Sequence, residues 1–257
     1  MTALLVSACG LLGLVVGSFL NVVVARVPKK ESVVSPRSRC PGCGTFIAPR
    51  DNVPVVSWLL LKGRCRSCGE RISVQYPLVE LATAVLFALT ALRFGLDAAL
   101  PAFLVFVAAL VAITPIDLAL RIVPNRIVYP TLFVSAPLLL AAAALDGDWT
   151  SAREAAIGGA AAFAVFFVLW YISPRGMGYG DVRLSGVIGM FLGWIGLWHL
   201  ALGLFLAFLS ASLIGVGLML VGRKGRKDLI PFGPFLALGA ILAVLVGDPL
   251  LRWYGVS

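Results

Sequence analysis

The chain alternates long apolar runs with short polar segments, and this pattern predicts a bundle of membrane-spanning helices. A helix needs about 20 apolar residues to cross a bilayer core about 30 Å thick. Eight runs approach that length, the sixth being the shortest: 3–25, 77–95, 98–116, 127–145, 155–172, 185–198, 200–221 and 231–250. Only one polar segment is long, residues 26–76. We therefore expect an all-α polytopic membrane bundle of about eight transmembrane helices, with a small domain between the first and the second.

The composition excludes a soluble fold. Of the 257 residues, 60% are hydrophobic and only 13% are charged, whereas soluble domains are about half apolar and a quarter charged. A transmembrane β-barrel is also excluded, because its strands alternate apolar and polar residues and have no long unbroken apolar runs. We expect a first transmembrane helix at 1–25, the small domain at 26–76 and a transmembrane core at 77–257. Two glycine pairs have a spacing that lets helices approach closely, Gly13 with Gly17 and Gly189 with Gly193.

The net charge of +9 indicates orientation in the membrane and not nucleic-acid binding. Lysine and arginine collect in loops that stay in the cytoplasm. If the N-terminus is outside, 18 of the 21 lysines and arginines fall in inside segments, ten of them in 26–76 and four in 223–227. This asymmetry predicts a multi-pass protein of the bacterial cytoplasmic (inner) membrane, with both termini outside and residues 26–76 in the cytoplasm.

Four of the five cysteines form two C-x-x-C pairs within 26–76, each followed directly by a glycine. They are Cys40, Cys43, Cys65 and Cys68. Two such turns can bring four thiolates to one tetrahedral zinc ion. Two disulfides are the alternative, but structural disulfides are rare in the reducing cytosol. Four cysteine ligands leave no coordination site for an activated water, so we predict a structural zinc that stabilises a zinc-knuckle domain with little core of its own.

Two aspartates at the predicted cytoplasmic side are the candidate catalytic groups. Asp117 ends the third apolar run, and Asp181 follows a turn that contains Gly178 and Gly180. Ionisable groups at membrane depth are costly and often functional, and two carboxylates that share a proton can activate water for peptide hydrolysis. Simpler explanations exist for each residue taken alone. Asp117 could pair with Arg121 at a helix end, and Asp181 lies beside a basic residue in a polar loop.

In combination, these features resemble the type IV prepilin peptidases, which are membrane aspartic proteases of the Gly-x-Gly-Asp type. The resemblance covers nearly the whole chain. Besides the cysteine pairs, it rests on the segments 17–23, 52–59, 76–80, 117–125, 178–181 and 231–234.

The resemblance implies an endopeptidase that removes the basic leader from type IV prepilins or pseudopilins, after a glycine, at the cytoplasmic membrane face. Asp117 and Asp181 match the family's catalytic aspartates, and we expect Gly178, Gly180 and Glu80 to support the substrate site. Members with the cysteine-bearing loop commonly also methylate the new N-terminal residue, using S-adenosylmethionine. No motif identifies the site of that methyl donor. The expected partners are prepilins and the lipid bilayer, without nucleic acid.

Three alternatives remain at this point. The chain could be a peptidase without methyltransferase activity, or a scaffold whose zinc knuckles bind a cytosolic partner. It could also be an ion-coupled transporter that relays charge through the same acids. A transporter would show broken hydrophobic segments in two corresponding halves, and the glycine-rich break before Asp181 has no counterpart near the third run.

Overall fold

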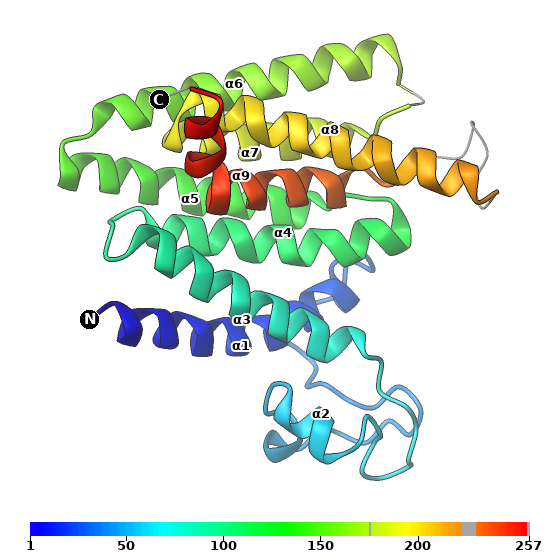
Figure 1. The fold of residues 1–257 in the computed structure, drawn as a ribbon. Helices are drawn as coiled ribbons and strands as arrows, with labels where there is room; N and C mark the ends of the chain where they lie inside the picture. Colours follow the sequence, from blue (N-terminus) through cyan, green and yellow to red (C-terminus); the bar gives the residue numbers. More distant parts are fainter. Residues whose placement is uncertain (175, 223–229, 256–257) are drawn as a thin grey trace. The chain divides into compact units, whose positions relative to one another are not determined.

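Regular structure in the described residues is helical (Figure 1). The computed structural model describes residues 1–174, 176–222 and 230–255. Within these ranges, β-structure is limited to two isolated antiparallel bridges. The predicted all-α class is therefore confirmed. Residues 175 and 223–227, which contribute to the predicted charge asymmetry, lie outside the described residues.

The predicted apolar runs correspond to eight long helices. Seven of them are long and apolar enough to cross a bilayer: α1 (Thr2–Arg26), α3 (Gln75–Phe94), α4 (Leu100–Leu120), α5 (Asn125–Asp146), α6 (Trp149–Ile172), α8 (Leu197–Leu220) and α9 (Gly233–Trp253). The eighth, α7 (Tyr179–Ile195), has 17 residues and is the run predicted to be the shortest. It begins at Tyr179 and not at residue 185, so Asp181 lies in a helix and not in a loop.

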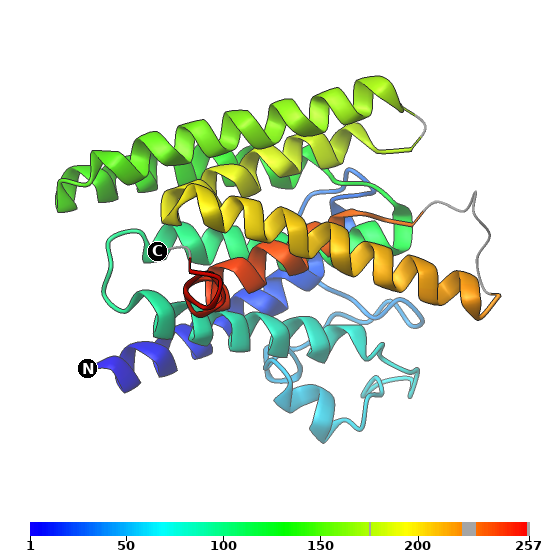
Figure 2. The same cartoon turned by 45° about the horizontal axis from the view of Figure 1, so that its top comes forward.

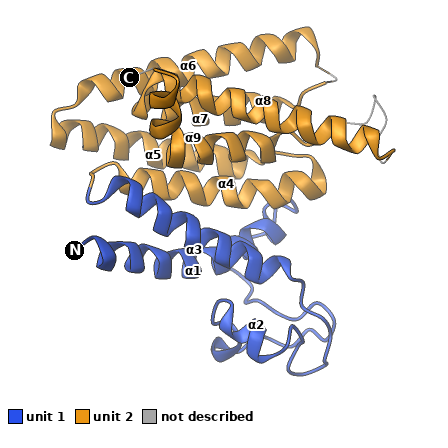
Figure 3. Ribbon diagram, viewed as in Figure 1, with its two compact units in different colours: residues 1–96 blue, residues 97–257 orange. Residues whose placement is uncertain are grey.

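The chain divides into two compact units, residues 1–96 and 97–257 (Figure 3). The first unit contains α1 and α3, with the short helices η1 (Pro49–Asp51) and α2 (Val56–Leu60) between them. The second contains α4 to α9. The second predicted span, α3, thus groups with the first helix and the cysteine segment. The predicted domain boundaries after residues 25 and 76 mark the two ends of the polar segment at the membrane surface. These boundaries stay a prediction.

In the first unit, small residues let α1 and α3 pack backbone to backbone. A Cβ added at Gly17 would lie 2.6 Å from the Cα of Glu80, and one added at Gly13 would lie 2.6 Å from the Cα of Ala84. Both distances are far below ordinary van der Waals contact, so only glycine fits at either position. The predicted close-packing role of this glycine pair is confirmed.

In the second unit, α7 is the most enclosed helix. Eleven of its 17 residues are buried. Gly158 of α6 packs against Gly193 of α7 so closely that a Cβ on Gly158 would lie 3.0 Å from the Gly193 Cα. On α4, Phe106 stacks on Phe191 of α7, with ring centroids 4.1 Å apart. Helices α8 and α9 lie side by side in both views (Figures 1 and 2). The sixth apolar run therefore holds the core of this unit together.

The α1–α3 packing predicts that Gly17→Ala destabilises the protein. The added methyl group must displace the α3 backbone, and overpacking of this kind costs about 1–3 kcal/mol. Gly10, on the same helix, is the matched control, because a Cβ there would lie 3.7 Å from Ala88 Cβ, an ordinary contact. Thermal unfolding in detergent should show a lower midpoint for Gly17→Ala and an unchanged or higher one for Gly10→Ala. Equal midpoints would contradict the close packing.

Candidate active site and metal site

The four paired cysteines converge in the first unit. Their Sγ atoms all lie within 4.8 Å of one another, and Cys40 Sγ and Cys68 Sγ are 3.8 Å apart. A tetrahedral ion with Zn–S bonds of about 2.3 Å requires S···S separations of about 3.8 Å. All the cysteines are free thiols. The donor set thus fits a tetrahedral metal ion, and the disulfide alternative is not what the structure contains.

The two C-x-x-C turns have the same backbone geometry. In the first, Cys40 N–H donates to the carbonyl of Thr45 (3.0 Å) and Gly44 N–H donates to the carbonyl of Cys40 (2.9 Å). In the second, Cys65 N–H donates to Glu70 (2.8 Å) and Gly69 N–H donates to Cys65 (2.9 Å). Gly44 and Gly69 have φ angles of +71° and +74°. The glycines are needed because other residues rarely adopt this left-handed conformation.

The surroundings of one thiol favour its metal-binding form. A hydrogen bond between Cys43 Sγ and Thr45 Oγ1 (3.3 Å), together with the backbone N–H of Thr45, lowers the pKa of Cys43 to about 6. Metals bind the thiolate and not the thiol. The first turn therefore favours the thiolate form of Cys43, whereas burial and the neighbouring thiols raise the pKa of Cys68.

Asp117 lies in the second unit, inside the last turn of α4, and the residue is only 4% exposed. Its Oδ2 accepts a hydrogen bond of 2.9 Å from the backbone N–H of Gly233, a residue 116 positions away. Gly233 is the first residue of α9, so this N–H has no partner within its own helix. The carboxylate of Asp117 therefore caps the N-terminus of α9.

Asp181 lies in the first turn of α7 and is 8% exposed. Its backbone N–H donates to the carbonyl of Gly178 (3.0 Å). Its Oδ1 is buried and is one of two buried side-chain oxygens in the described residues that have no hydrogen-bond partner. A Cβ on the neighbouring Gly180 would lie 2.8 Å from Val123 Cβ, so the start of α7 meets the connection that follows α4 and Asp117. The structure thus brings together the two aspartates that the sequence analysis selected.

The simpler explanations for the two aspartates are not supported. Arg121 is exposed and ends α4 in a left-handed conformation with φ 56°. Within the described ranges, no ion pair joins it to Asp117. Arg183 turns away from Asp181, since its guanidinium hydrogen-bonds Asn125 at the start of α5 and lies over the ring of Tyr179, 4.4 Å from the centroid.

The glycines before Asp181 make room beside its carboxylate. A Cβ on Gly178 would lie 3.4 Å from Asp181 Oδ2. A Cβ on Gly180 would lie 2.8 Å from the Cβ of Val123, in the connection between α4 and α5. Gly180 therefore allows the start of α7 to approach the end of α4, whereas Gly178 leaves only backbone next to the carboxylate.

Glu80 belongs to the first unit and not to the unit of the aspartates. It is the sixth residue of α3, beyond the first turn, and 7% exposed. Its Oε2 accepts a hydrogen bond of 2.7 Å from the backbone N–H of Val55. This residue therefore holds the segment that precedes α2.

No sequence pattern marks Gly233 as part of the site. The segment 231–234 enters only through the family resemblance. A glycine carries no reactive group, and its contact with Asp117 spans most of the second unit. A Cβ at this position would lie 2.7 Å from Asp117 Oδ2, which explains why glycine stands there.

Comparisons with known proteins agree with the two-unit division. Residues 11–94 match the Bacterial Peptidase A24 N-terminal domain, and residues 104–220 match the Type IV leader peptidase family. A protein of Bacillus subtilis (strain 168) is 38% identical, with 94% of this chain and 94% of the relative aligned. One of Aeromonas hydrophila is 36% identical, over 95% and 91%. One of Myxococcus xanthus (strain DK1622) is 43% identical, over 84% and 64%. All three are named prepilin leader peptidase/N-methyltransferase. No solved structure matches the chain.

The cysteine cluster predicts one bound metal ion per chain. Cys40→Ser should lower the metal content well below one, because it removes one of four ligands from a small domain. Cys9 is the matched control, since it is buried in α1 and is not part of the cluster. Elemental analysis of the gently purified protein measures both. Full metal content in Cys40→Ser would overturn the site, and a loss in Cys9→Ser would show that the assay reports unfolding.

Proposed function

This chain belongs to the type IV leader peptidase family, and we propose on that basis that it removes the leader from type IV prepilins or pseudopilins and then methylates the new N-terminus. It acts as an aspartic endopeptidase at the cytoplasmic face of the bacterial inner membrane. The observation that carries the peptidase assignment is the buried pair formed by Asp117 and Asp181, one of whose oxygens has no hydrogen-bond partner.

The pair supplies the acid and the base of peptide hydrolysis. Two carboxyl groups that act on one water do not readily ionise together, and in this mechanism they share a proton. The ionised group takes a proton from water as the water attacks the scissile carbonyl, and the neutral group hydrogen-bonds the carbonyl oxygen and stabilises the tetrahedral intermediate. Asp181 Oδ1 is the free position for the water or the substrate oxygen. The Gly233 N–H donates to Asp117 Oδ2, and this hydrogen bond holds the Asp117 carboxyl group in place.

The substrate fits a site at a membrane surface. A prepilin carries an apolar helix preceded by a basic leader, and basic segments stay in the cytoplasm. We place both termini of the enzyme outside, and the aspartates and the cysteine domain inside. Cleavage follows a glycine of the substrate. Gly178 leaves only backbone beside Asp181, so an extended substrate strand can lie next to the carboxylate there.

The second activity and the metal belong to the same proposal. S-adenosylmethionine supplies the methyl group for the amine that cleavage creates. The metal is zinc, held by the four cysteines. A closed set of four thiolates gives the ion a structural role, in which its binding energy stabilises the fold of residues 26–76.

The aspartate assignment predicts that Asp117→Asn and Asp181→Asn each abolish cleavage. An amide cannot exchange the shared proton, and losing one acid–base partner should lower kcat by about 10³-fold or more. The measurement incubates the purified protein in detergent with a prepilin and follows the mass of the product. Labelled S-adenosylmethionine in the same assay should label the processed product of the wild type.

The exposed Asp146, at the end of α5, is the matched control. Asp146→Asn should cleave at the wild-type rate. Persistent cleavage by either site variant would remove the dyad from the mechanism. If the wild-type product is correctly processed but carries no label, the protein is a peptidase without methyltransferase activity.

The capping contact predicts that Gly233→Ala impairs catalysis without removing a titratable group. The new methyl group must push the Asp117 carboxylate aside, and a displacement of about 1 Å can cost about 10²-fold in rate. The kcat for cleavage should fall, with little change in KM. Gly217→Ala is the control, because nothing lies within 4 Å of a Cβ at Gly217. A wild-type kcat in Gly233→Ala would show that the contact does not position the carboxylate.

A further inference from the structure

The short helix α2 carries an apolar face that the described residues of the first unit leave exposed. Val56, Leu59 and Leu60 are three of the five residues of α2, and they are 51%, 60% and 77% exposed. Their spacing places them on one side of the helix. Single exposed apolar side chains are ordinary on a protein, whereas a group of them indicates an interaction site. We call these three residues the α2 face.

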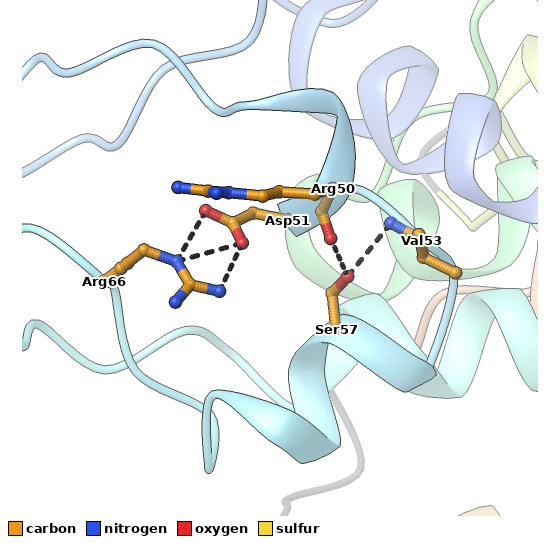
Figure 4. Close-up of polar contacts among 5 residues, drawn as sticks. All are labelled: Arg50, Asp51, Val53, Ser57 and Arg66. Atoms are coloured by element: carbon orange, nitrogen blue, oxygen red, sulfur yellow. Dashed lines mark hydrogen bonds and ion pairs between the residues drawn. The ribbon is translucent and has the colours of Figure 1, made fainter.

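The other two residues of α2 are turned inward and hold the helix in this orientation. The buried hydroxyl of Ser57 accepts from the Val53 N–H (3.1 Å) and donates to the Arg50 carbonyl (2.9 Å) (Figure 4). The indole Nε1–H of Trp58 donates to the Ile72 carbonyl (3.2 Å). The polar and aromatic side chains therefore face the interior of the first unit, and the aliphatic ones face out, which is the reverse of the pattern expected for a helix in water.

A contact with the membrane helix α3 sets the depth of α2. The Val55 N–H, directly before α2, donates to Glu80 Oε2 at 2.7 Å. Glu80 is the sixth residue of α3, so it lies about 8 Å along this helix from its first residue, at a rise of about 1.5 Å per residue. The neighbouring Leu78 and Leu81 of α3 are exposed, as lipid-facing side chains are. In both views α2 lies alongside the first half of α3 (Figures 1 and 2). The α2 face is therefore held at the level of the bilayer surface.

The charge around α2 complements an anionic lipid surface. Lys62 and Arg64 follow α2 directly, and both are exposed. Residues 26–76 contain ten lysines and arginines but only three acids, and one of these acids, Asp51, is paired with Arg66 at 2.7 Å (Figure 4). Helices that lie in a membrane interface combine an apolar face with basic residues beside it. Anionic headgroups attract such basic residues next to a membrane helix.

We propose that the α2 face inserts into the bilayer that α1 and α3 cross, with Lys62 and Arg64 on anionic lipid headgroups. Interfacial helices bury their apolar face about 5–10 Å into the boundary between headgroups and acyl chains, and the contact with Glu80 holds α2 at that level. A cytosolic protein is a poorer occupant, because it would have to enter the headgroup layer to cover this face. The cysteine segment thus gains a third attachment to the membrane, besides α1 and α3. Docking of this kind does not depend on either proposed reaction.

The test places the full-length protein in nanodiscs of phosphatidylcholine and phosphatidylglycerol that contain a phospholipid with a photoreactive diazirine near the carbonyl end of one acyl chain. After irradiation, mass spectrometry of the digested protein identifies the residues that carry lipid adducts. The wild type should form adducts on residues 56–60 and on Leu81, which serves as the internal standard. The double variant Leu59→Ser with Leu60→Ser should form about tenfold fewer adducts on 56–60, since it loses most of the apolar area that insertion buries. Its adducts on Leu81 should not change.

Val34→Ser is the matched control, because Val34 is an exposed aliphatic side chain of the same polar segment but is not part of the α2 face. Its adducts on 56–60 should equal those of the wild type. Lys62→Gln with Arg64→Gln should lose about half of these adducts or more, and wild type in nanodiscs of phosphatidylcholine alone should show a loss of the same order. All variants should keep their metal, which shows that the cysteine segment is folded.

Three results would overturn the proposal. If wild-type protein carries adducts on Leu81 but none on 56–60, the α2 face lies in water, whatever the variants show. If the adducts on 56–60 persist in Leu59→Ser with Leu60→Ser, this face is not what inserts. If 56–60 carry no lipid adducts but cross-link to an added prepilin, the face binds a protein and not the bilayer.

Discussion

The hydrogen bond between the Gly233 amide and the Asp117 carboxylate is the contact on which the second unit's site depends. A carboxylate buried in an apolar bundle is costly unless hydrogen-bond donors surround it. The first turn of a helix offers amide groups without partners and a positive end of the helix dipole. Asp117 uses the start of α9, and Asp181 lies in the first turn of α7. The end of α4 must therefore meet the starts of two other helices.

That meeting requires positions with no side chain. At Gly233 a methyl group would occupy the space of the Asp117 carboxylate, and at Gly180 it would collide with Val123. Further into the bundle, Gly158 and Gly193 bring α6 and α7 together in the same way. Association between helices in a membrane gains little from apolar burial, so close packing of small residues supplies the attraction. Glycines thus hold the helices of the bundle together, and other glycines at the helix starts determine where the two acids lie.

Local patterns in the sequence predicted the elements better than their contacts. The eight apolar runs are eight helices because a bilayer forces backbone groups to pair within a segment. The start of α7 was placed too late, since the residues before 185 include polar side chains that become buried or paired only in the folded unit. The cysteine cluster was predictable because each C-x-x-C turn sets its own geometry. The role of Gly233 was not, because it arises only from folding.

The grouping of α3 with α1 has a similar cause. Hydropathy predicts which segments enter the membrane but not which helices pack against each other. The packing follows from shape, since Gly13 and Gly17 let the backbone of α3 approach α1 closely. The first unit consequently combines two membrane helices with the cysteine segment, and Glu80 of α3 accepts a hydrogen bond from the Val55 N–H.

The proposed chemistry assigns an order to the two reactions. The nitrogen at the scissile bond is an amide, whose lone pair is delocalised into the carbonyl, so it cannot accept a methyl group. Hydrolysis by the aspartates converts it into an amine, which is a nucleophile once it loses its proton. Methylation must therefore follow cleavage. An enzyme that has lost its aspartates should leave prepilin unmethylated even with its methyl-donor site intact, because the acceptor is never formed.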